Sequence, residues 1–240
     1  MTKSLYGGLL YLCLSACSSD IPPIVGCDSV GDIKPVCNMK SPEDIAALVD
    51  GRHLLLANFG GMENGTGSIS LFDTQTEKVT ELFPPKNGTL EINHASWGDA
   101  GCPPPSLDQF SPHGTHLRRL TDGGWRYLVV NHGGRESIEF FELTLAGSNS
   151  SLAWRGCVLA AEETFMNDVV GLPNGDLIFS RMFHHGGDLE MLKSILGIDT
   201  GDLWRWNQET GLKILPGTDA AQPNGLELSA DGRFVFANMY

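Results

Sequence analysis

Short runs of alternating apolar and polar residues, separated by glycine-rich turns, recur along most of the chain. Typical runs are HLLLANF (53–59), WRYLVVNH (125–132) and SIEFFELTL (137–145). A two-residue alternation places every second side chain on the same face of a strand, so each run predicts a half-buried β-strand. The stretches 73–76 and 133–134 have the composition of tight turns and predict hairpins between neighbouring strands.

The predicted strand pairs recur at intervals of roughly 40 to 50 residues, which is the repeat length of β-propeller blades. A β-sandwich is the alternative all-β architecture. The strands of a sandwich would not need potential ligand residues repeated at their entries. The predicted strands of this chain do carry such residues. The pattern therefore favours a propeller.

One segment, GDLEMLKSILG (187–197), has helical rather than strand periodicity, and Gly197 supplies a stop signal. Four apolar residues fall on one face of this predicted helix: Leu189, Leu192, Ile195 and Leu196. The helix is too short to build a core of its own. Because it lies between two predicted blades, we expect it to cap one face of the ring.

Composition agrees with an all-β protein and restricts its partners. The chain has 240 residues, 41% hydrophobic content, 29 glycines and 13 prolines, as expected for one turn-rich domain with a sizeable core. A net charge of −13 disfavours nucleic acid as a partner, because its phosphates would be repelled. Most of this charge is explained by a solvated acidic surface.

The first 17 residues have the features of an export signal. Lys3 gives a weak positive start, residues 5–14 are apolar, and Leu14-Ser15-Ala16-Cys17 matches a bacterial lipobox. The apolar run is too short to span a bilayer. We predict an exported bacterial cell-envelope lipoprotein, in the periplasm or at the outer membrane, lipidated at Cys17 and anchored by its lipid alone. An ordinary cleaved signal peptide is the alternative, and residues 18–36 are predicted to form a tether.

Four cysteines remain after the export signal: Cys27, Cys37, Cys102 and Cys157. Their spacing does not match a zinc site, and an exported protein faces an oxidising compartment. We therefore predict disulfides, although four cysteines allow three pairings.

Oxygen-bearing side chains stand at the entries of three predicted hairpins, in the runs 41–60, 166–180 and 223–238. The residues concerned are Glu43 and Asp44, Asn167 and Asp168, and Asn224. The entries of successive propeller blades converge on the central axis, and Ca²⁺ binds six to eight oxygen ligands. The pattern thus predicts an axial calcium site, although each asparagine alone is equally typical of a turn or a cap.

Two histidines beside glycines, His113 and His132, are candidates for activating a water molecule. An imidazole near neutral pKa can act as a general base, and a second one can relay its proton. The alternative is that each is a hydrogen-bonded structural histidine. His184 and His185 are candidates for lining a pocket. The sequence has no GxSxG, P-loop or dinucleotide-binding motif that would indicate other chemistry.

Five motifs of residues 37–240, taken in order, resemble the paraoxonase/arylesterase group of six-bladed β-propellers, which is related more distantly to the gluconolactonase and regucalcin-like family. The motifs are SPEDI, SPHGTHL, VVNHGGRESIEFFEL, MNDVV and QPNGLELSADGRFVFAN. The resemblance implies a six-bladed type of propeller, of which about four blades are present here. It also implies hydrolysis of small-molecule lactones or aryl esters.

The resemblance implies two calcium ions in the central tunnel. The catalytic ion would be bound by Glu43, Asn167 and Asn224. The deeper structural ion would be bound by Asp44, Asp168 and the backbone carbonyl of Thr115. His113 would be the general base, assisted by His132, and the ion would polarise the substrate carbonyl. Helix 187–197 would resemble the lid of the family, and Cys37 the cysteine that ties the first strand to the last.

The sequence departs from this pattern because it stops at Tyr240, within the expected fourth blade. The next calcium ligands of the family, an Asp-Asn pair, and the partner of Cys37 would lie beyond that position. The catalytic expectation therefore belongs to a longer parent. The alternatives are a non-catalytic propeller lipoprotein with structural calcium, an inactive fragment, and a metal-free propeller of the strictosidine-synthase type.

Overall fold

The computed structural model describes residues 26–37, 39–61, 66–92, 97–161, 164–184 and 188–240. The chain divides into two units, 1–37 and 38–240. In the first unit, Val30 and Ile33 form an isolated antiparallel bridge. The predicted export signal, Cys17 and most of the tether lie outside the described residues.

The larger unit consists of antiparallel sheets whose strands follow one another in chain order. The first sheet contains β1 (Pro42–Ala47), β2 (His53–Asn58), β3 (Ser68–Asp73) and β4 (Lys78–Phe83). The second contains β5 (Pro112–Arg119), β6 (Trp125–Asn131), β7 (Ser137–Thr144) and β8 (Ser151–Leu159). The third contains β9 (Phe165–Gly171), β10 (Leu177–Phe183), β11 (Asp202–Asn207) and β12 (Gly211–Ile214). A two-stranded sheet of β13 (Leu226–Leu228) and β14 (Val235–Ala237) follows.

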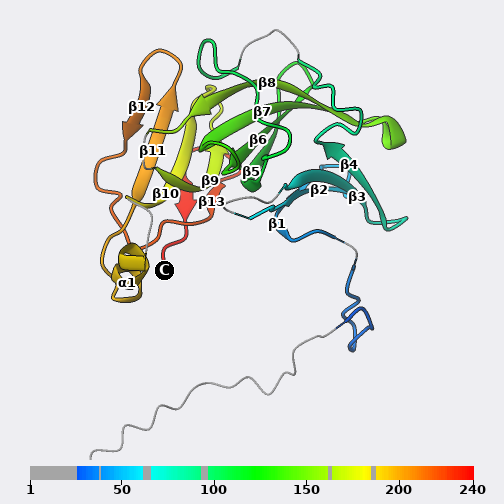
Figure 1. Cartoon of the computed structure of the whole chain (residues 1–240), viewed down its shortest axis with the longest axis horizontal. Coiled ribbons are helices and arrows are strands. Elements are labelled where there is room, and N and C mark those ends of the chain that lie inside the picture. Colours follow the sequence, from blue (N-terminus) through cyan, green and yellow to red (C-terminus); the bar gives the residue numbers. More distant parts are fainter. Residues whose placement is uncertain (1–25, 38, 62–65, 93–96, 162–163, 185–187) are drawn as a thin grey trace, which may run out of the picture. The chain divides into compact units, whose positions relative to one another are not determined.

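The first strand of each sheet packs beside the first strand of the next one. Strand β5 contacts both β1 and β9, and β9 contacts β13 (Figure 1). Successive four-stranded meanders with adjacent inner strands are the arrangement of propeller blades. The described residues thus form three complete blades and a two-stranded start of a fourth, which confirms the predicted partial β-propeller. The predicted turns at 73–76 and 133–134 also lie between paired strands.

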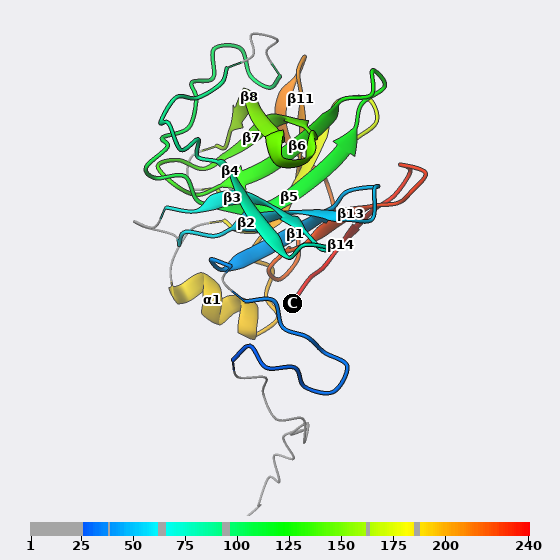
Figure 2. The same ribbon diagram turned by 90° about the vertical axis from the view of Figure 1, so that its right-hand side faces the viewer.

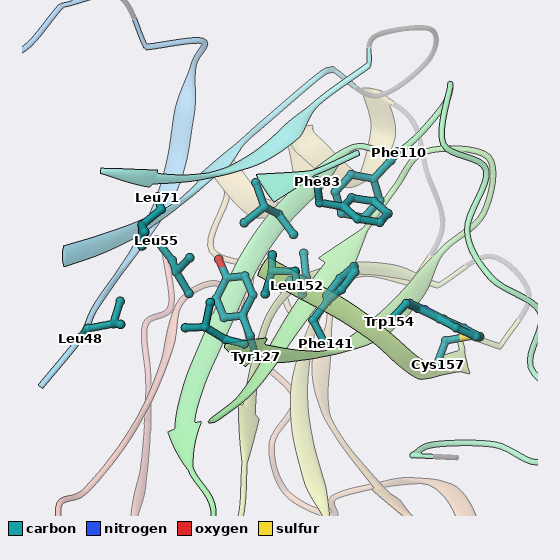
Figure 3. Packing of buried hydrophobic residues seen from close by; sticks show 13 residues of the cluster. Leu48, Leu55, Leu71, Phe83, Phe110, Tyr127, Phe141, Leu152, Trp154 and Cys157 are labelled. Carbon is teal, nitrogen blue, oxygen red and sulfur yellow. The ribbon is translucent and has the colours of Figure 1, made fainter. Parts of the chain in front are cut away.

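Apolar side chains fill the spaces between neighbouring sheets. Between the first two sheets, Phe83 packs against Phe110 and Phe141, with ring centroids 4.7 and 4.9 Å apart (Figure 3). Leu55 and Tyr127 belong to the same fully buried cluster. A second cluster joins the second and third sheets: Leu128, Val130, Phe140, Val169, Phe179 and Trp206 are among its members. The two-residue alternation seen in the sequence thus places apolar side chains of the second sheet in both clusters.

The cysteines form two disulfides, as predicted, and the structure selects one of the three pairings. Cys102 bonds to Cys157 of β8, and Cys27 bonds to Cys37. The pairing of Cys37 corrects the expectation drawn from the family resemblance, in which its partner lies beyond Tyr240. Only 10 positions separate Cys27 from Cys37, so this bond closes a local loop in place of joining the first strand to a last one.

The single α-helix of the described residues, α1 (Asp188–Ile195), lies within the predicted range and outside the sheets (Figures 1 and 2). Its polar residues Glu190 and Ser194 are buried, whereas the four apolar residues predicted to share a face are all exposed. Periodicity therefore identified the helix but not the direction in which its apolar side points. Among the described residues, no helix is long and apolar enough to cross a membrane.

Replacement of Phe141 by alanine tests the aromatic contact between the first two blades. Because Phe141 is fully buried against Phe83 and Phe110, we expect Phe141→Ala to lower the free energy of unfolding by about 3–5 kcal/mol. Urea unfolding followed by near-ultraviolet circular dichroism measures the change. The matched control Phe236→Ala removes an exposed ring and is expected to have little effect. Equal effects of the two variants would contradict this account of the core.

Candidate functional site

The predicted site residues gather at the amino-terminal ends of the inner strands. Glu43 and Asp44 lie in β1, Thr115 and His113 lie in β5, and Asn167 and Asp168 lie in β9. Asn224 precedes β13, and His132 follows β6. Most of these residues thus lie inside strands. The sequence pattern had instead placed them ahead of the hairpins. Since β1, β5 and β9 are neighbours, residues far apart in sequence meet at one end of the strand layer.

Asp44 and Thr115 connect the first two inner strands. Oδ2 of Asp44 accepts hydrogen bonds from the Thr115 main-chain N–H at 2.7 Å and from the Thr115 hydroxyl at 2.6 Å. Its Oδ1 accepts from the N–H of Ile45. The resemblance assigned Thr115 a role through its backbone carbonyl. The hydroxyl contact is an additional role that the sequence did not indicate.

Asp168 is held at the next junction, between β9 and β13. Its Oδ1 accepts a hydrogen bond from the N–H of Val169, and its Oδ2 accepts one from the N–H of Leu226 at 2.6 Å. Gly114 permits this packing. A Cβ at that position would lie 2.4 Å from both the Asn167 carbonyl oxygen and Asp168 Oδ1. Glycine at 114 therefore allows β5 to approach β9 closely enough to place the two strands' polar groups together.

Burial makes the Asp168 carboxyl resist ionisation. Only 9% of the residue is exposed, and desolvation raises its pKa to about 8, assisted by the negative charges of Asp44 and Glu43. The two main-chain hydrogen bonds oppose this shift without cancelling it. Within the described residues, no lysine or arginine forms an ion pair with any of these three carboxylates. The cluster thus lacks a compensating positive charge.

Asn224 is connected to Asp168 through Ser180, a residue that sequence reasoning missed. The Ser180 hydroxyl donates to the Asn224 carbonyl at 2.6 Å and accepts from the N–H of Asp168 at 3.0 Å. The Asn224 side-chain oxygen accepts from the N–H of Gly225. Ser180 is buried on β10, where its alternation position gave no sign of a link to the inner strands.

His113 lies between Asn167 and Glu43. Its Nδ1 is 3.0 Å from the Asn167 carbonyl oxygen, so Nδ1 carries the proton and donates it. The unprotonated Nε2 then lies 3.4 Å from Glu43 Oε1. Burial, together with the neighbouring His132, lowers the pKa of His113 to about 4, which keeps the ring neutral at pH 7. Desolvation and then the charge of Asp44 raise the pKa of Glu43 to about 7.

His132 packs beside His113, with ring centroids 5.0 Å apart. Its Nδ1 is 2.6 Å from Oε1 of Glu136, and its buried Nε2 has no hydrogen-bond partner among the described residues. Phe165 stacks on the His132 ring, and Phe59 meets both histidines edge-on. Sequence reasoning missed Glu136, although its position four residues after His132 in a turn was a usable signal.

The remaining candidates do not join this group in the described structure. The main-chain N–H of His184 donates to the Thr200 carbonyl, while His185 and Cys17 lie outside the described residues. A surface cavity of about 560 Å³ lies along β4 and the start of β8, away from the candidate site residues.

The donor set fits a hard divalent cation in type. Carboxylate, amide and main-chain oxygens are the ligands that Ca²⁺ prefers, and the unbalanced charge of Glu43, Asp44 and Asp168 would be neutralised by such an ion. Within the described part of the chain, no three Asp, Glu, His or Cys side chains converge as a ready metal cluster. Amide and main-chain oxygens would therefore have to complete any coordination shell.

The pH dependence of stability tests the raised pKa values of the carboxyls. Folding raises the pKa of Asp168 to about 8 and that of Glu43 to about 7, so their favourable contribution is complete at low pH and is lost as pH rises through those values. In EGTA, we expect the urea midpoint to fall as pH rises from 6.5 to about 8; below pH 6.5 the lowered pKa of His113 has the opposite effect on stability. Asp168→Asn should flatten the decline. A wild-type midpoint that is constant or rises over this window would contradict the assignment.

Comparisons with known proteins add a fold likeness and no family. The chain matches no protein-family model and no curated protein sequence. Among solved structures, it is similar to an oxidoreductase from Thermus thermophilus described as a glucose dehydrogenase, with 15% sequence identity and a TM-score of 0.44. The match covers 84% of this chain and 59% of that protein, so the chain spans less than two thirds of its length. A likeness at this level carries no functional argument.

Proposed function

We propose that the chain belongs to a calcium-dependent hydrolase of lactones or aryl esters, of the paraoxonase-like type. The observation that carries the proposal is the position of neutral His113, between the Asn167 carbonyl and carboxyl groups that have no lysine or arginine partner among the described residues. A neutral imidazole can take a proton from water, and an uncompensated acidic cluster can hold a cation next to it.

The five motifs that resemble the paraoxonase/arylesterase group lead us to propose two ions. Glu43, Asn167 and Asn224 would hold the catalytic Ca²⁺, and Asp44, Asp168 and the Thr115 carbonyl would hold the structural one. When bound, the catalytic ion would supply positive charge to polarise the substrate carbonyl and to stabilise the developing oxyanion.

The protein residues would perform the proton transfers. With Nδ1–H held by the Asn167 carbonyl, His113 presents Nε2 as the acceptor for a water proton. Glu136 contacts Nδ1 of His132, as the Asn167 carbonyl contacts Nδ1 of His113. The buried Nε2 of His132 would therefore be available to receive a proton relayed from His113. Phe59 and Phe165 cover the two rings and limit their access to bulk water. The pair therefore suits a proton relay in a partly dry environment.

A second candidate function is binding without catalysis. Asp44 and Asp168 each accept main-chain hydrogen bonds across a junction between neighbouring inner strands, which is what a structural carboxylate does. In that case, calcium would stabilise the propeller, and the surface would bind a ligand or a partner. Retention of calcium-dependent stability without hydrolysis would distinguish this function from the first.

We further propose that the protein is an exported cell-envelope lipoprotein lipidated at Cys17. Its support is the lipobox at positions 14–17, and the two disulfides fit an oxidising compartment. Catalytic activity is proposed for the protein with all of its blades.

Hydrolysis of a lactone and aryl-ester panel, with and without EGTA, tests the proposed reaction. We expect turnover to require calcium, and His113→Gln to lower kcat by about 100-fold or more, because the acceptor for the water proton is lost. Calcium affinity, measured by calorimetry, should change little in this variant. His53→Gln, on β2, serves as the matched control, since its ring pairs with Asp50 away from the site.

Undiminished turnover in His113→Gln would remove His113 from the role of base. Calcium binding without hydrolysis of any panel member would favour the non-catalytic function instead.

A further inference from the structure

A cluster of basic side chains lies at the opposite end of β5 from the acidic site. Arg118 of β5 faces Arg126 of β6 directly in the strand register, and His116 lies on the same face of β5 as Arg118. His113 and Arg118 are five positions apart, which corresponds to roughly 16 Å along a strand. Like charges placed directly opposite each other are unfavourable. The spacing along β5 separates the cluster from the acidic site. The direct pairing of two arginines needs a physical explanation of its own.

Arg126 is the least compensated group of this cluster. Only 9% of the residue is exposed, and its Nε has no hydrogen-bond partner among the described residues. Six other arginines of the described chain each pair with a carboxylate: Arg52, Arg135, Arg155, Arg181, Arg205 and Arg233. Burial and then the charge of Arg118 lower the pKa of Arg126, as expected for a buried cation beside another cation. A buried guanidinium without a counter-ion indicates that an anion belongs there.

Gly171, the last residue of β9, makes room for the two basic side chains. A Cβ at Gly171 would lie 2.7 Å from Nη2 of Arg126 and 3.5 Å from Nδ1 of His116. The N–H of Gly171 donates to His116 Nδ1 at 3.3 Å, and its carbonyl accepts from Nη1 of Arg118 at 3.2 Å. His116 thus carries its proton on Nε2 and offers a further donor. The cluster presents donors and positive charge, the combination that binds an anion.

A cavity of about 350 Å³ adjoins this cluster. His116, Arg118 and Arg119 line one side of it, and Leu228, the last residue of β13, lines another together with residues 229–232. Asp231 is the one carboxylate of this lining, and its oxygens are already engaged by Arg233 and by the Ser229 hydroxyl. The hollow therefore gives a small anion access to His116 and Arg118, the members of the cluster that line it, without an unpaired carboxylate in the lining.

We propose that this cluster is a binding site for a small oxyanion of phosphate type. Arg126 and Arg118 supply charged, fork-shaped donors, and His116 Nε2–H supplies a neutral one. Since Gly171 of β9 and the turn after β13 border the same site, a bound anion joins the second, third and fourth blades. The site does not depend on the proposed hydrolase activity.

Titration of the full chain with inorganic phosphate tests the proposal. The experiment is run in EGTA, so that no metal-bound phosphate contributes, and at constant ionic strength set with chloride. We expect phosphate to raise the melting temperature of the wild type more than chloride does, with a calorimetrically measurable affinity. Arg126→Met should weaken that affinity at least about tenfold, because charged hydrogen bonds are lost. Lys213→Met, on exposed β12, is the charge-matched control and should bind phosphate as the wild type does.

Stability without phosphate provides a second readout. Arg126→Met removes an uncompensated buried charge, so in chloride the variant should melt at or above the wild-type temperature. Arg118→Met should also weaken phosphate binding, which keeps the test valid if Arg126→Met folds poorly. Equal stabilisation by phosphate and chloride, or equal phosphate affinity in the wild type and both arginine variants, would overturn the proposal.

Discussion

The burial of the Asp168 carboxyl at the junction of the inner strands, beside the carboxyls of Glu43 and Asp44, is the physical constraint on which the rest of the site depends. Desolvation, assisted by the charges of Asp44 and Glu43, raises the pKa of Asp168, and the described residues give its carboxyl main-chain hydrogen bonds but no lysine or arginine partner. Burying such charges destabilises a protein unless a cation or protons neutralise them. The blades can assemble closely here because Gly114 has no side chain and because Asp44 and Asp168 accept backbone N–H groups from the neighbouring blades.

The same strand layer carries opposite charges at its two ends. At the amino-terminal ends, the Glu43 carboxyl lies 3.4 Å from His113, and carboxyl oxygens of this kind are ligands for a hard cation. At the opposite end of β5, Arg118 and the facing Arg126 of β6 form no ion pair with a carboxylate of the described residues. In a chain of net charge −13, this separation places a local basic site in a mostly acidic molecule. Both sites lie where inner strands of different blades meet, so ligands at either end would hold blades together as well as serve chemistry.

The sequence predicted the repeated blades because alternation and turn composition are local properties of the chain. The resemblance likewise placed Glu43, Asp168 and His113 together, since their motifs recur in the same order as the inner strands. Contacts made by unremarkable residues could not be predicted in this way. Ser180 links Asp168 to Asn224 from a second strand, and the partner of Cys37 is set by a local loop. The exposed apolar side of α1 likewise depends on tertiary packing that helical periodicity does not contain.

The most direct test of the central claim is a calorimetric calcium titration of the 240-residue chain, with thermal melting of the same samples. We expect saturable calcium binding and a raised melting temperature for the wild type, and a large loss of both in Asp168→Asn, which removes one carboxylate. Magnesium at the same concentration controls for general charge screening. Absence of calcium binding to the wild type, or equal binding by wild type and Asp168→Asn, would contradict the claim that this carboxylate cluster is a cation site.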